Sequence, residues 1–351
     1  MRKRESQQLV PPAPAYAPAD FLTLSLSLFF ACSPPTLHNL ELLQHAAPPN
    51  EAPAPDPDPA SRPRRRGAAR TLRRLGPIVG LLFVLSGGLI MLLERSLLYP
   101  AQHMKPRAPV DLPPGAERWW FEHPGEDGTK TAAHFYPGNG VDEQHPGPVV
   151  LFAHGNAEFI EDYEEAFPMY RKLGVSVLLV EYRGCGHSTG KATKDNLTAD
   201  HLAFFDRLVT DPRVDPTKVV LHGRSMGGGI AATVAAARPA AAALILESTY
   251  TSISRVAWSL WVPGFLIRDD WDVVEALGLY QGPVMIVHSE IDEVLDYEMG
   301  VQNAAARPDA TFHTYRLSHL NPMPSQFFRD AEAFFREHGI LPPESPQEEA
   351  A

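Results

Sequence analysis

From about residue 96 onward, short runs of β-branched and aliphatic residues alternate with helical patterns. A run such as 175–180 has no polar face, which indicates a strand covered on both sides of a sheet. Strands that alternate with helices predict an α/β fold with a mostly parallel, doubly wound sheet. The predicted strands are 148–153, 175–181, 218–222, 243–247, 283–288 and 311–316, and the predicted helices are 160–173, 194–210, 226–238, 297–306 and 324–338. Ahead of them, 119–123 and 131–136 predict an antiparallel hairpin.

The beginning of the chain has a different pattern. Thirteen of the 35 prolines lie in the first 70 residues, and a chain so rich in proline neither completes backbone hydrogen-bond ladders nor buries a core. We therefore expect a disordered tail over 1–74. An apolar run at 21–32 also resembles the centre of a signal peptide, with Cys32 as a candidate lipid-modified residue, although the bulky Phe29 and Phe30 disfavour cleavage there.

Residues 75–93 are nineteen consecutive residues without charge. A helix rises about 1.5 Å per residue, so this length matches the roughly 30 Å hydrocarbon core of a bilayer. Seven arginines lie just before the run, which predicts a cytoplasmic tail and a following domain on the opposite, extracytoplasmic side. The alternative is a buried core helix. The predicted divisions are the tail 1–74, a transmembrane anchor 75–95, a catalytic domain 96–341 and a flexible C-terminus 342–351.

The overall composition, 44% apolar and 21% charged, is that of a chain able to bury a large core. The formal net charge is −11; the first 74 residues hold ten basic and six acidic residues, or +4, which leaves −15 for the remainder. Such an acidic domain argues against a nucleic-acid partner. The two cysteines, Cys32 and Cys185, exclude a disulfide framework and a Cys-rich zinc module. We expect neither a cofactor nor a metal, and the oligomeric state stays open.

A candidate nucleophile lies at Gly223-Arg224-Ser225-Met226-Gly227, between the predicted strand 218–222 and a helix of small residues. Glycines on both sides of the serine allow a sharp strand-to-helix turn that exposes the hydroxyl, and the helix directs its N-terminal dipole at an oxyanion. A second match, Gly186-His187-Ser188-Thr189-Gly190, is not followed by such a helix. Ser225 is therefore favoured over Ser188.

Two phosphate-binding interpretations compete with this one. The segment 185–191 resembles a P-loop, but Cys185 replaces the first glycine and Ala192 replaces the magnesium-binding hydroxyl. The segment 227–232 resembles a dinucleotide-binding loop, with Glu247 as its ribose ligand. That second interpretation leaves the acidic residue and the histidine further along the chain without a role.

A serine nucleophile on a doubly wound sheet needs an acid and then a histidine from later strand ends. Asp292 follows the strand 283–288, and His319 follows the strand 311–316. The histidine accepts the hydroxyl proton, and the carboxylate fixes the tautomer of the histidine. The alternative acids are Glu247, Glu290 and Glu293, whereas His187, His222 and His288 are expected to be structural or supporting residues.

The turn Phe152-Ala153-His154-Gly155-Asn156 ends an earlier strand. A glycine there lets a backbone N–H approach the reacting carbonyl oxygen, so we expect the amides of Asn156 and Met226 to form an oxyanion hole. The alternative is an ordinary strand-ending turn.

Together, the turn ending in Asn156, the motif Tyr182-Arg183-Gly184-Cys185-Gly186-His187-Ser188, the serine motif, Asp292 and His319 resemble the α/β-hydrolase superfamily. The nearest likeness is to membrane-anchored abhydrolase-domain depalmitoylases and monoacylglycerol lipases. The resemblance covers about 94–340 and implies hydrolysis of esters or thioesters by Ser225, His319 and Asp292. Ser289 and Ser318 depart from it, because these enzymes usually carry glycine there.

The predicted function is therefore that of a serine hydrolase whose partners are a small ester or acyl substrate and, through 75–93, a membrane. The connection 248–282 holds three of the five tryptophans, which fit either an apolar rim for an acyl chain or ordinary helix packing. Two alternatives stay open: an aminopeptidase-type hydrolase with the same triad, for which Glu158, Glu161 and Asp162 could bind an amine, and a catalytically silent scaffold. A haloalkane-type enzyme is disfavoured because it would need a carboxylate at position 225.

Overall fold

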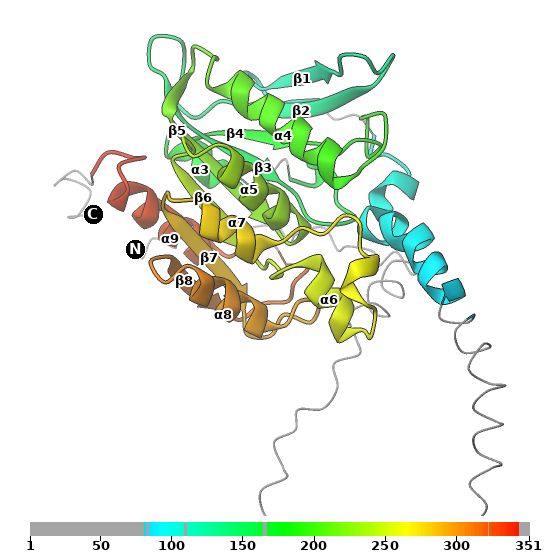
Figure 1. Cartoon of the computed structure of the whole chain (residues 1–351). Coiled ribbons are helices and arrows are strands. Elements are labelled where there is room, and N and C mark those ends of the chain that lie inside the picture. The colour runs from blue at the N-terminus through cyan, green and yellow to red at the C-terminus, as the bar shows by residue number, and fades with distance from the viewer. Residues whose placement is uncertain (1–80, 82–83, 109–110, 164–166, 322, 344–351) are drawn as a thin grey trace, which may run out of the picture.

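The computed structural model describes residues 81, 84–108, 111–163, 167–321 and 323–343. Its centre is an eight-stranded sheet in the order β1-β2-β4-β3-β5-β6-β7-β8 (Figure 1). The first two strands pair antiparallel, β2 pairs antiparallel with β4, and the later neighbours pair in parallel. The strands are β1 (Glu117–Glu122), β2 (Lys130–Tyr136), β3 (Gly147–Ala153), β4 (Ser176–Val180), β5 (Val214–Arg224), β6 (Ala243–Glu247), β7 (Val284–Ser289) and β8 (Thr311–Tyr315). The predicted sheet and hairpin are confirmed.

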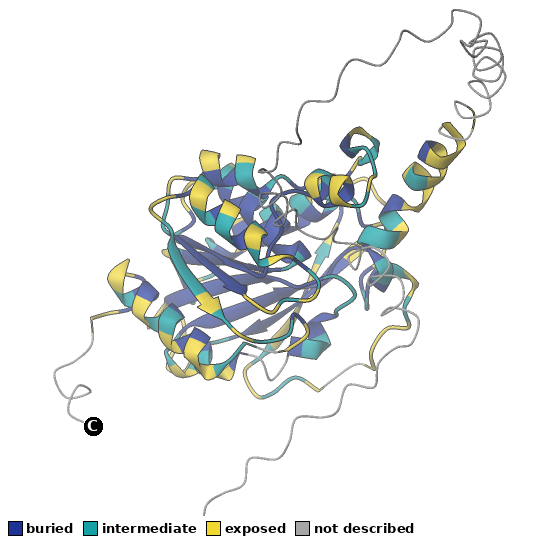
Figure 2. Ribbon diagram, turned by 90° about the horizontal axis from the view of Figure 1, so that it is seen from below, coloured by how far each residue is buried: buried dark blue, intermediate teal, exposed yellow. Residues whose placement is uncertain are grey.

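Helices flank the sheet, so the inner strands are buried, while the outer helix faces and parts of the edge strands β1 and β8 are exposed (Figure 2). The helical elements are η2 (Pro100–His103), η3 (Ile160–Tyr163), α3 (Pro168–Lys172), α4 (Lys194–Leu208), α5 (Met226–Ala237), α6 (Ile253–Ser259), η4 (Gly264–Leu266), α7 (Val273–Leu279), α8 (Tyr297–Ala306) and α9 (Ser325–Glu337). The single helix predicted over 160–173 is wrong: η3 and α3 are separate elements, and Pro168 starts the second. The structure also adds α6 and α7, whose first turns are capped by the side chains of Ser252 and Asp272.

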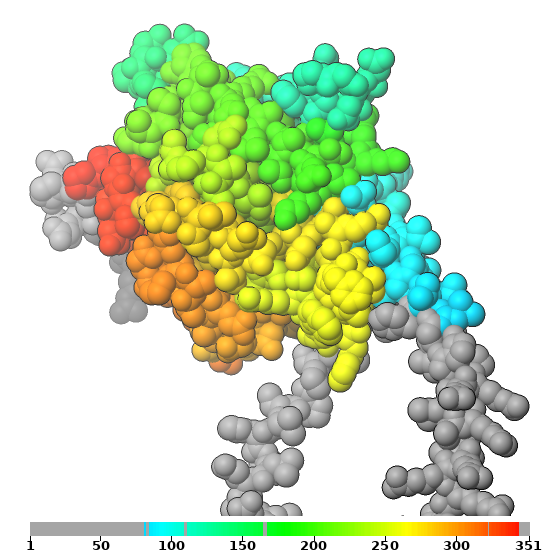
Figure 3. All heavy atoms as spheres, viewed as in Figure 1, coloured from blue at the N-terminus to red at the C-terminus, as the bar shows by residue number. Residues whose placement is uncertain are grey.

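Residues 84–98 form a helix that leads into the domain and lies beside the α6–η4 segment (Figure 3). The carboxylate of Glu94 is buried and accepts hydrogen bonds from the amides of Arg268 at 2.6 Å and Asp269 at 2.8 Å. Asp269 in turn accepts hydrogen bonds from Arg95 at 3.2 Å and from the Tyr99 hydroxyl at 3.1 Å. This reciprocal exchange fixes the helix end against the domain.

The predicted anchor is described only in part, because 75–80 and 82–83 lie outside the described residues, as do the tail 1–74 and most of 342–351. Among the residues that the structure does describe, no helix has both the length and the apolar character needed to cross a bilayer.

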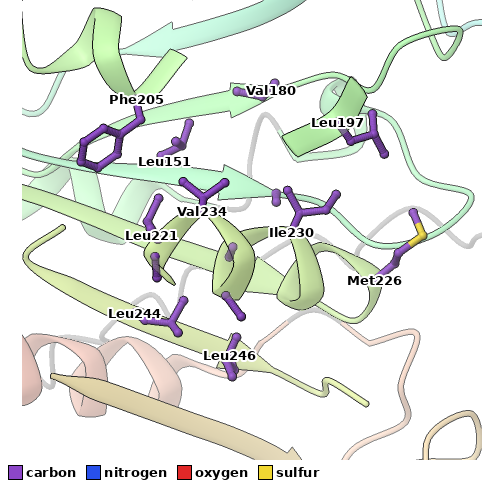
Figure 4. Packing of buried hydrophobic residues seen from close by; sticks show 14 of the residues in the cluster. Leu151, Val180, Leu197, Phe205, Leu221, Met226, Ile230, Val234, Leu244 and Leu246 are labelled. Atoms are coloured by element: carbon purple, nitrogen blue, oxygen red, sulfur yellow. The ribbon is translucent and has the colours of Figure 1, made fainter. Parts of the chain in front are cut away.

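Two apolar cores lie on the two faces of the sheet, because successive residues of a strand point to opposite sides. Leu221 of β5 faces a core built with α4, α5 and α7 (Figure 4). Its neighbour Val220 faces the second core, with α3 and α9. These cores hold the parallel strands side by side, so the turns at their carboxyl ends meet at one edge of the sheet.

Candidate active site

Ser225 lies between the last residue of β5 and the first residue of α5, with φ 51° and ψ −115°. This backbone conformation is strained for any residue with a side chain. The flanking glycines make the turn possible: a Cβ on Gly223 would lie 2.2 Å from the carbonyl oxygen of Gly227, and one on Gly227 would lie 2.0 Å from that of Ala153. The structure therefore has the strand–elbow–helix arrangement that the motif predicts.

The structure brings Ser225 together with His319 and Asp292. The Nε2 atom of His319 lies 3.1 Å from the Oγ atom of Ser225, and its Nδ1 atom lies 2.7 Å from a carboxylate oxygen of Asp292. Ser225 follows β5, Asp292 follows β7 and His319 follows β8. The three side chains thus form a continuous hydrogen-bonded chain, although the serine and the histidine are 94 residues apart in sequence.

The Asp292 side chain is buried, and burial by itself raises the pKa of a carboxyl group. The hydrogen bond and charge of His319, together with the backbone amides of Leu295 at 2.8 Å and Val294 at 2.9 Å, outweigh burial and lower the pKa of Asp292. Asp292 is therefore an anion at neutral pH and can hold His319 in the tautomer whose Nε2 faces the serine.

The competing candidates occupy other places. Ser188 is buried and accepts a hydrogen bond from the amide of Ala132 at 2.9 Å. Glu290 pairs with Arg316 at 2.6 Å. Glu247 lies 3.2 Å from the ring of His222, whereas the two ring nitrogens of His319 face Asp292 and Ser225.

The other histidines that the sequence singles out also have partners. His288 lies 3.0 Å from the carbonyl oxygen of Leu295, next to the acid loop, and His187 lies 3.8 Å from Glu161. No group of three or more His, Cys, Asp or Glu side chains in the described part of the chain is placed to hold a metal ion.

The predicted oxyanion segment lies against the elbow, because the Ala153 and His154 carbonyl oxygens face Gly227. Met226 is the first residue of α5, where an amide N–H has no acceptor inside the helix. The Gly155 amide donates a hydrogen bond to the Glu158 carboxylate at 2.6 Å, so this amide already has an acceptor. The assignment of the Asn156 and Met226 amides as oxyanion donors stays a prediction.

Residues 144–269 match the serine aminopeptidase (S33) family. An uncharacterized protein of Mycobacterium tuberculosis is 29% identical over 255 residues, which cover 70% of this chain and 88% of that protein. The human α/β hydrolase domain-containing protein 17B is 31% identical over 153 residues, which cover 43% of this chain and 52% of that protein. Among solved structures, Thermogutta terrifontis esterase 2, phosphoramylated by tabun, aligns with a TM-score of 0.55 at 17% identity, over 68% of this chain and 100% of that one.

The chain has the α/β-hydrolase fold and is similar to α/β hydrolase domain-containing proteins. The resemblance drawn from the motifs is thereby confirmed, and the family match together with the hydrolase-domain relative supports hydrolase activity.

The sequence motifs did not predict a role for Arg224, the residue just before the candidate nucleophile. Its guanidinium is buried and donates hydrogen bonds to the backbone carbonyls of His319 and, at 3.3 Å, Asn321. Its Nε atom lies 3.4 Å from Glu247 and 3.9 Å from Glu158. Arg224 therefore ties the elbow to the histidine loop, and its burial is balanced by two carboxylates. The available signal was a charged residue inside the elbow, between the apolar run 219–221 and a helix of small residues.

The two serines that depart from the superfamily pattern link the acid loop to the histidine loop. The Ser289 hydroxyl donates to the carbonyl of Leu317 at 2.6 Å and accepts from the amide of Leu317 at 3.0 Å. The Ser318 hydroxyl donates to Glu293, which also accepts from the His319 amide at 3.1 Å. Glycine at either position would lose these links, so the departures have a structural role here.

Proposed function

We propose that the chain is a serine hydrolase that cleaves carboxylic ester or thioester bonds of small or acyl-type substrates through an acyl-enzyme on Ser225. The observation that carries the proposal is the pair of hydrogen bonds that links Ser225 to His319 at 3.1 Å and His319 to Asp292 at 2.7 Å. A serine hydroxyl is a weak nucleophile until a base within hydrogen-bond reach accepts its proton, and this arrangement supplies that base.

In the proposed mechanism the Oγ atom of Ser225 attacks the carbonyl carbon of the substrate while its proton passes to Nε2 of His319. Asp292 stabilises the imidazolium cation that forms. His319 then returns the proton to the departing alkoxide or thiolate, which leaves an acyl group on Ser225. Water, deprotonated by His319, hydrolyses the acyl-enzyme by the same steps in reverse. The Asn156 and Met226 amides are the proposed oxyanion donors, each worth about 3 kcal/mol in the transition state.

The serine aminopeptidase family match favours a second candidate, a peptide hydrolase that would need an acidic group for the substrate amine. The three acidic candidates have other partners. Glu158 accepts from Gly155 and Tyr163, Asp162 pairs with Arg107 at 3.0 Å, and Glu161 is next to His187. This pattern favours ester or thioester substrates. Rates of the full-length protein toward matched acyl esters, thioesters and aminoacyl amides separate the two, and faster cleavage of the amides would reverse the preference.

A fluorophosphonate probe tests the serine chemistry directly and also tests the alternative of a silent scaffold. We expect the probe to label the wild-type protein, and the Ser225→Ala variant to lose both labelling and hydrolysis of short p-nitrophenyl esters. Ser188→Ala is the matched control and should keep both. Absence of labelling in the wild type would support the scaffold, and loss of labelling only in Ser188→Ala would move the nucleophile.

We also propose that the uncharged run 75–93 anchors the protein in a membrane, with residues 1–74 on the cytoplasmic side. The support is the length of the run and the seven arginines that precede it. Carbonate extraction of membranes from expressing cells measures this, and release of the full-length protein into the supernatant contradicts it.

A further inference from the structure

The α6–η4 segment exposes large aromatic side chains to solvent. Trp261 is 89% exposed, Phe265 is 76% exposed and Trp258 is 60% exposed. Trp261 also has φ 61°, a left-handed conformation that is strained for a bulky residue. A strained backbone that holds an apolar side chain in water is not stabilised by packing against the described residues, which indicates that its contact partner lies beyond them.

The helix of residues 84–98 continues this apolar surface. Its exposed side includes Val84, Leu85, Leu89 and Leu92. The helix touches the aromatic segment because Leu266 lies 3.6 Å from the position of a Cβ on Gly87, and Arg268 donates to the carbonyl of Met91. Figure 3 shows the two segments, in cyan and yellow, adjoining on the same side of the molecule. We call this joint surface, formed by the exposed residues of 84–92 and of 258–265, the apolar face.

Basic residues flank the aromatic side chains, and one of them, Arg268, also pairs within the chain with Glu94 at 2.9 Å. Residues 253–268 contain Arg255 and Arg268 and no aspartate or glutamate. Both arginines are exposed, one on each side of the aromatic side chains along the chain. Aromatic side chains flanked by arginine are typical of the boundary between the hydrocarbon and the headgroups of a bilayer, and arginine there pairs with anionic headgroups.

The point at which the helix 84–98 contacts the α6–η4 segment shows how deep that segment would lie in a lipid layer that surrounds the uncharged run. The uncharged run ends at Leu93, and Glu94, the next residue, is buried in the domain. Gly87, which touches Leu266, is six residues before Leu93, or about 9 Å along the helix axis. A lipid layer that surrounds the run up to Leu93 therefore also reaches the aromatic segment.

The apolar face is also close to the site. The side-chain amide of Asn156, in the predicted oxyanion segment, donates to the carbonyl of Leu97 at 3.4 Å, near the end of the same helix. The end of the helix thus contacts the predicted oxyanion segment directly.

We propose that Trp258, Trp261 and Phe265, together with the exposed apolar side of 84–92, insert into the interface of an anionic phospholipid bilayer and hold the active site at the lipid surface. The docking itself does not depend on the chemistry at Ser225. Its consequence, that esters carried in the bilayer are the preferred substrates, rests on the proposed function.

Fluorescence quenching in vesicles tests the docking. The full-length protein is reconstituted in phosphatidylcholine–phosphatidylglycerol vesicles at high lipid-to-protein ratio, with and without brominated acyl chains, which quench tryptophans that contact them. We expect strong quenching in the wild type and at least about a twofold smaller quenchable signal in Trp261→Ser, since interfacial tryptophans contact the acyl chains. The matched control is Trp120→Ser. This variant removes a partly exposed tryptophan on β1, which is not part of the apolar face.

Equal quenching in the wild type and Trp261→Ser overturns the proposal. So does a Trp261 signal that changes with protein concentration and not with bromination, because it identifies a second copy of the chain as the partner. The measurement can be repeated in Ser225→Ala, so its failure is separate from any failure of the proposed chemistry.

Activity provides the second readout. We expect the double variant Trp261→Ser/Phe265→Ser to lose about tenfold of its rate on a vesicle-borne acyl ester, because a smaller buried apolar area weakens the docking of the domain on the lipid surface. Its rate on a soluble short-chain p-nitrophenyl ester should equal that of Trp120→Ser. Equal rates of the double variant and the wild type on the vesicle-borne ester contradict a role of the face in substrate delivery.

Discussion

The elbow at Ser225 and the loops that carry Asp292 and His319 are held in place by different kinds of contact. At the elbow, backbone packs directly on backbone, and Gly223 and Gly227 are required because any Cβ would overlap a neighbouring carbonyl group. In the acid and histidine loops, polar side chains make the contacts: Ser289 and Ser318 link the loops to each other, and Arg224 links the elbow to the histidine loop. The elbow thus depends on glycines that have no side chain, and the acid and histidine loops depend on particular polar side chains.

The largest effect is expected at the elbow. Gly227→Ala places a methyl group 2.0 Å from the Ala153 carbonyl oxygen, and only backbone movement can relieve the overlap. We expect a loss of about 3 kcal/mol or more in the free energy of unfolding, measured by urea denaturation, together with loss of activity. Gly278→Ala, on the helix α7 with open space around it, is the control and should be neutral or stabilising. A stable, active Gly227→Ala protein would contradict the packing account of the elbow.

The next effect concerns the link between the two regions. Arg224→Gln removes the cation that holds the His319 carbonyl and leaves Glu247 without its charge partner. We expect kcat to fall about a hundredfold through misplacement of the imidazole, with KM within about twofold of wild type.

Two further variants test this interpretation. Arg224→Lys should recover more stability than activity, because lysine keeps the charge but cannot reach both carbonyls. Arg238→Gln breaks an exposed ion pair with Asp206 and serves as the control, with kcat expected to stay unchanged. A purely structural role for Arg224 would instead lower the midpoint of thermal unfolding and leave the kcat of the folded fraction intact.

Within the loops the effect should be smaller. Ser289→Gly removes the hydrogen bonds to Leu317, so we expect a loss of about 1–2 kcal/mol in unfolding free energy and roughly tenfold in kcat. Ser318→Gly should cost less, because that hydroxyl is half-buried and makes its link to an exposed carboxylate. The reverse order of the two variants would show that the link through Glu293 is the more important one.

The smallest effect is the pH dependence of the acid loop. The pKa of Asp292 is lowered from 3.8 in the folded protein, so its contribution to stability is complete above that value and is lost as the pH falls through the folded pKa. We expect the stability advantage of wild type over Asp292→Asn to be constant above about pH 5 and to shrink below it. Denaturation of both proteins across the acid range measures this, and an advantage that grows on acidification contradicts the lowered pKa.

The elements that sequence predicted well are those set by local patterns. β6 and α8 have the predicted bounds, and the elbow has the predicted strand–turn–helix order, because continuous apolar runs and paired glycines act within a few residues. Arg224 and Ser289 show what local patterns miss. The carbonyl partners of Arg224 are 95 and 97 residues away, and Leu317, which Ser289 contacts twice, is 28 residues away, so nothing near them in sequence indicates these contacts.

The amino-acid sequence by itself determined which turn can lift a hydroxyl out of the sheet, because only glycine permits the close approach of backbone at Gly223 and Gly227. The tertiary structure decided which acid and which histidine reach that hydroxyl, because parallel strands distant in sequence end at the same edge of the sheet. It also decided that the aromatic side chains of 258–265 lie beside the helix 84–98 instead of inside a core. Spacing along the chain carries the first kind of information, and only long-range packing carries the second.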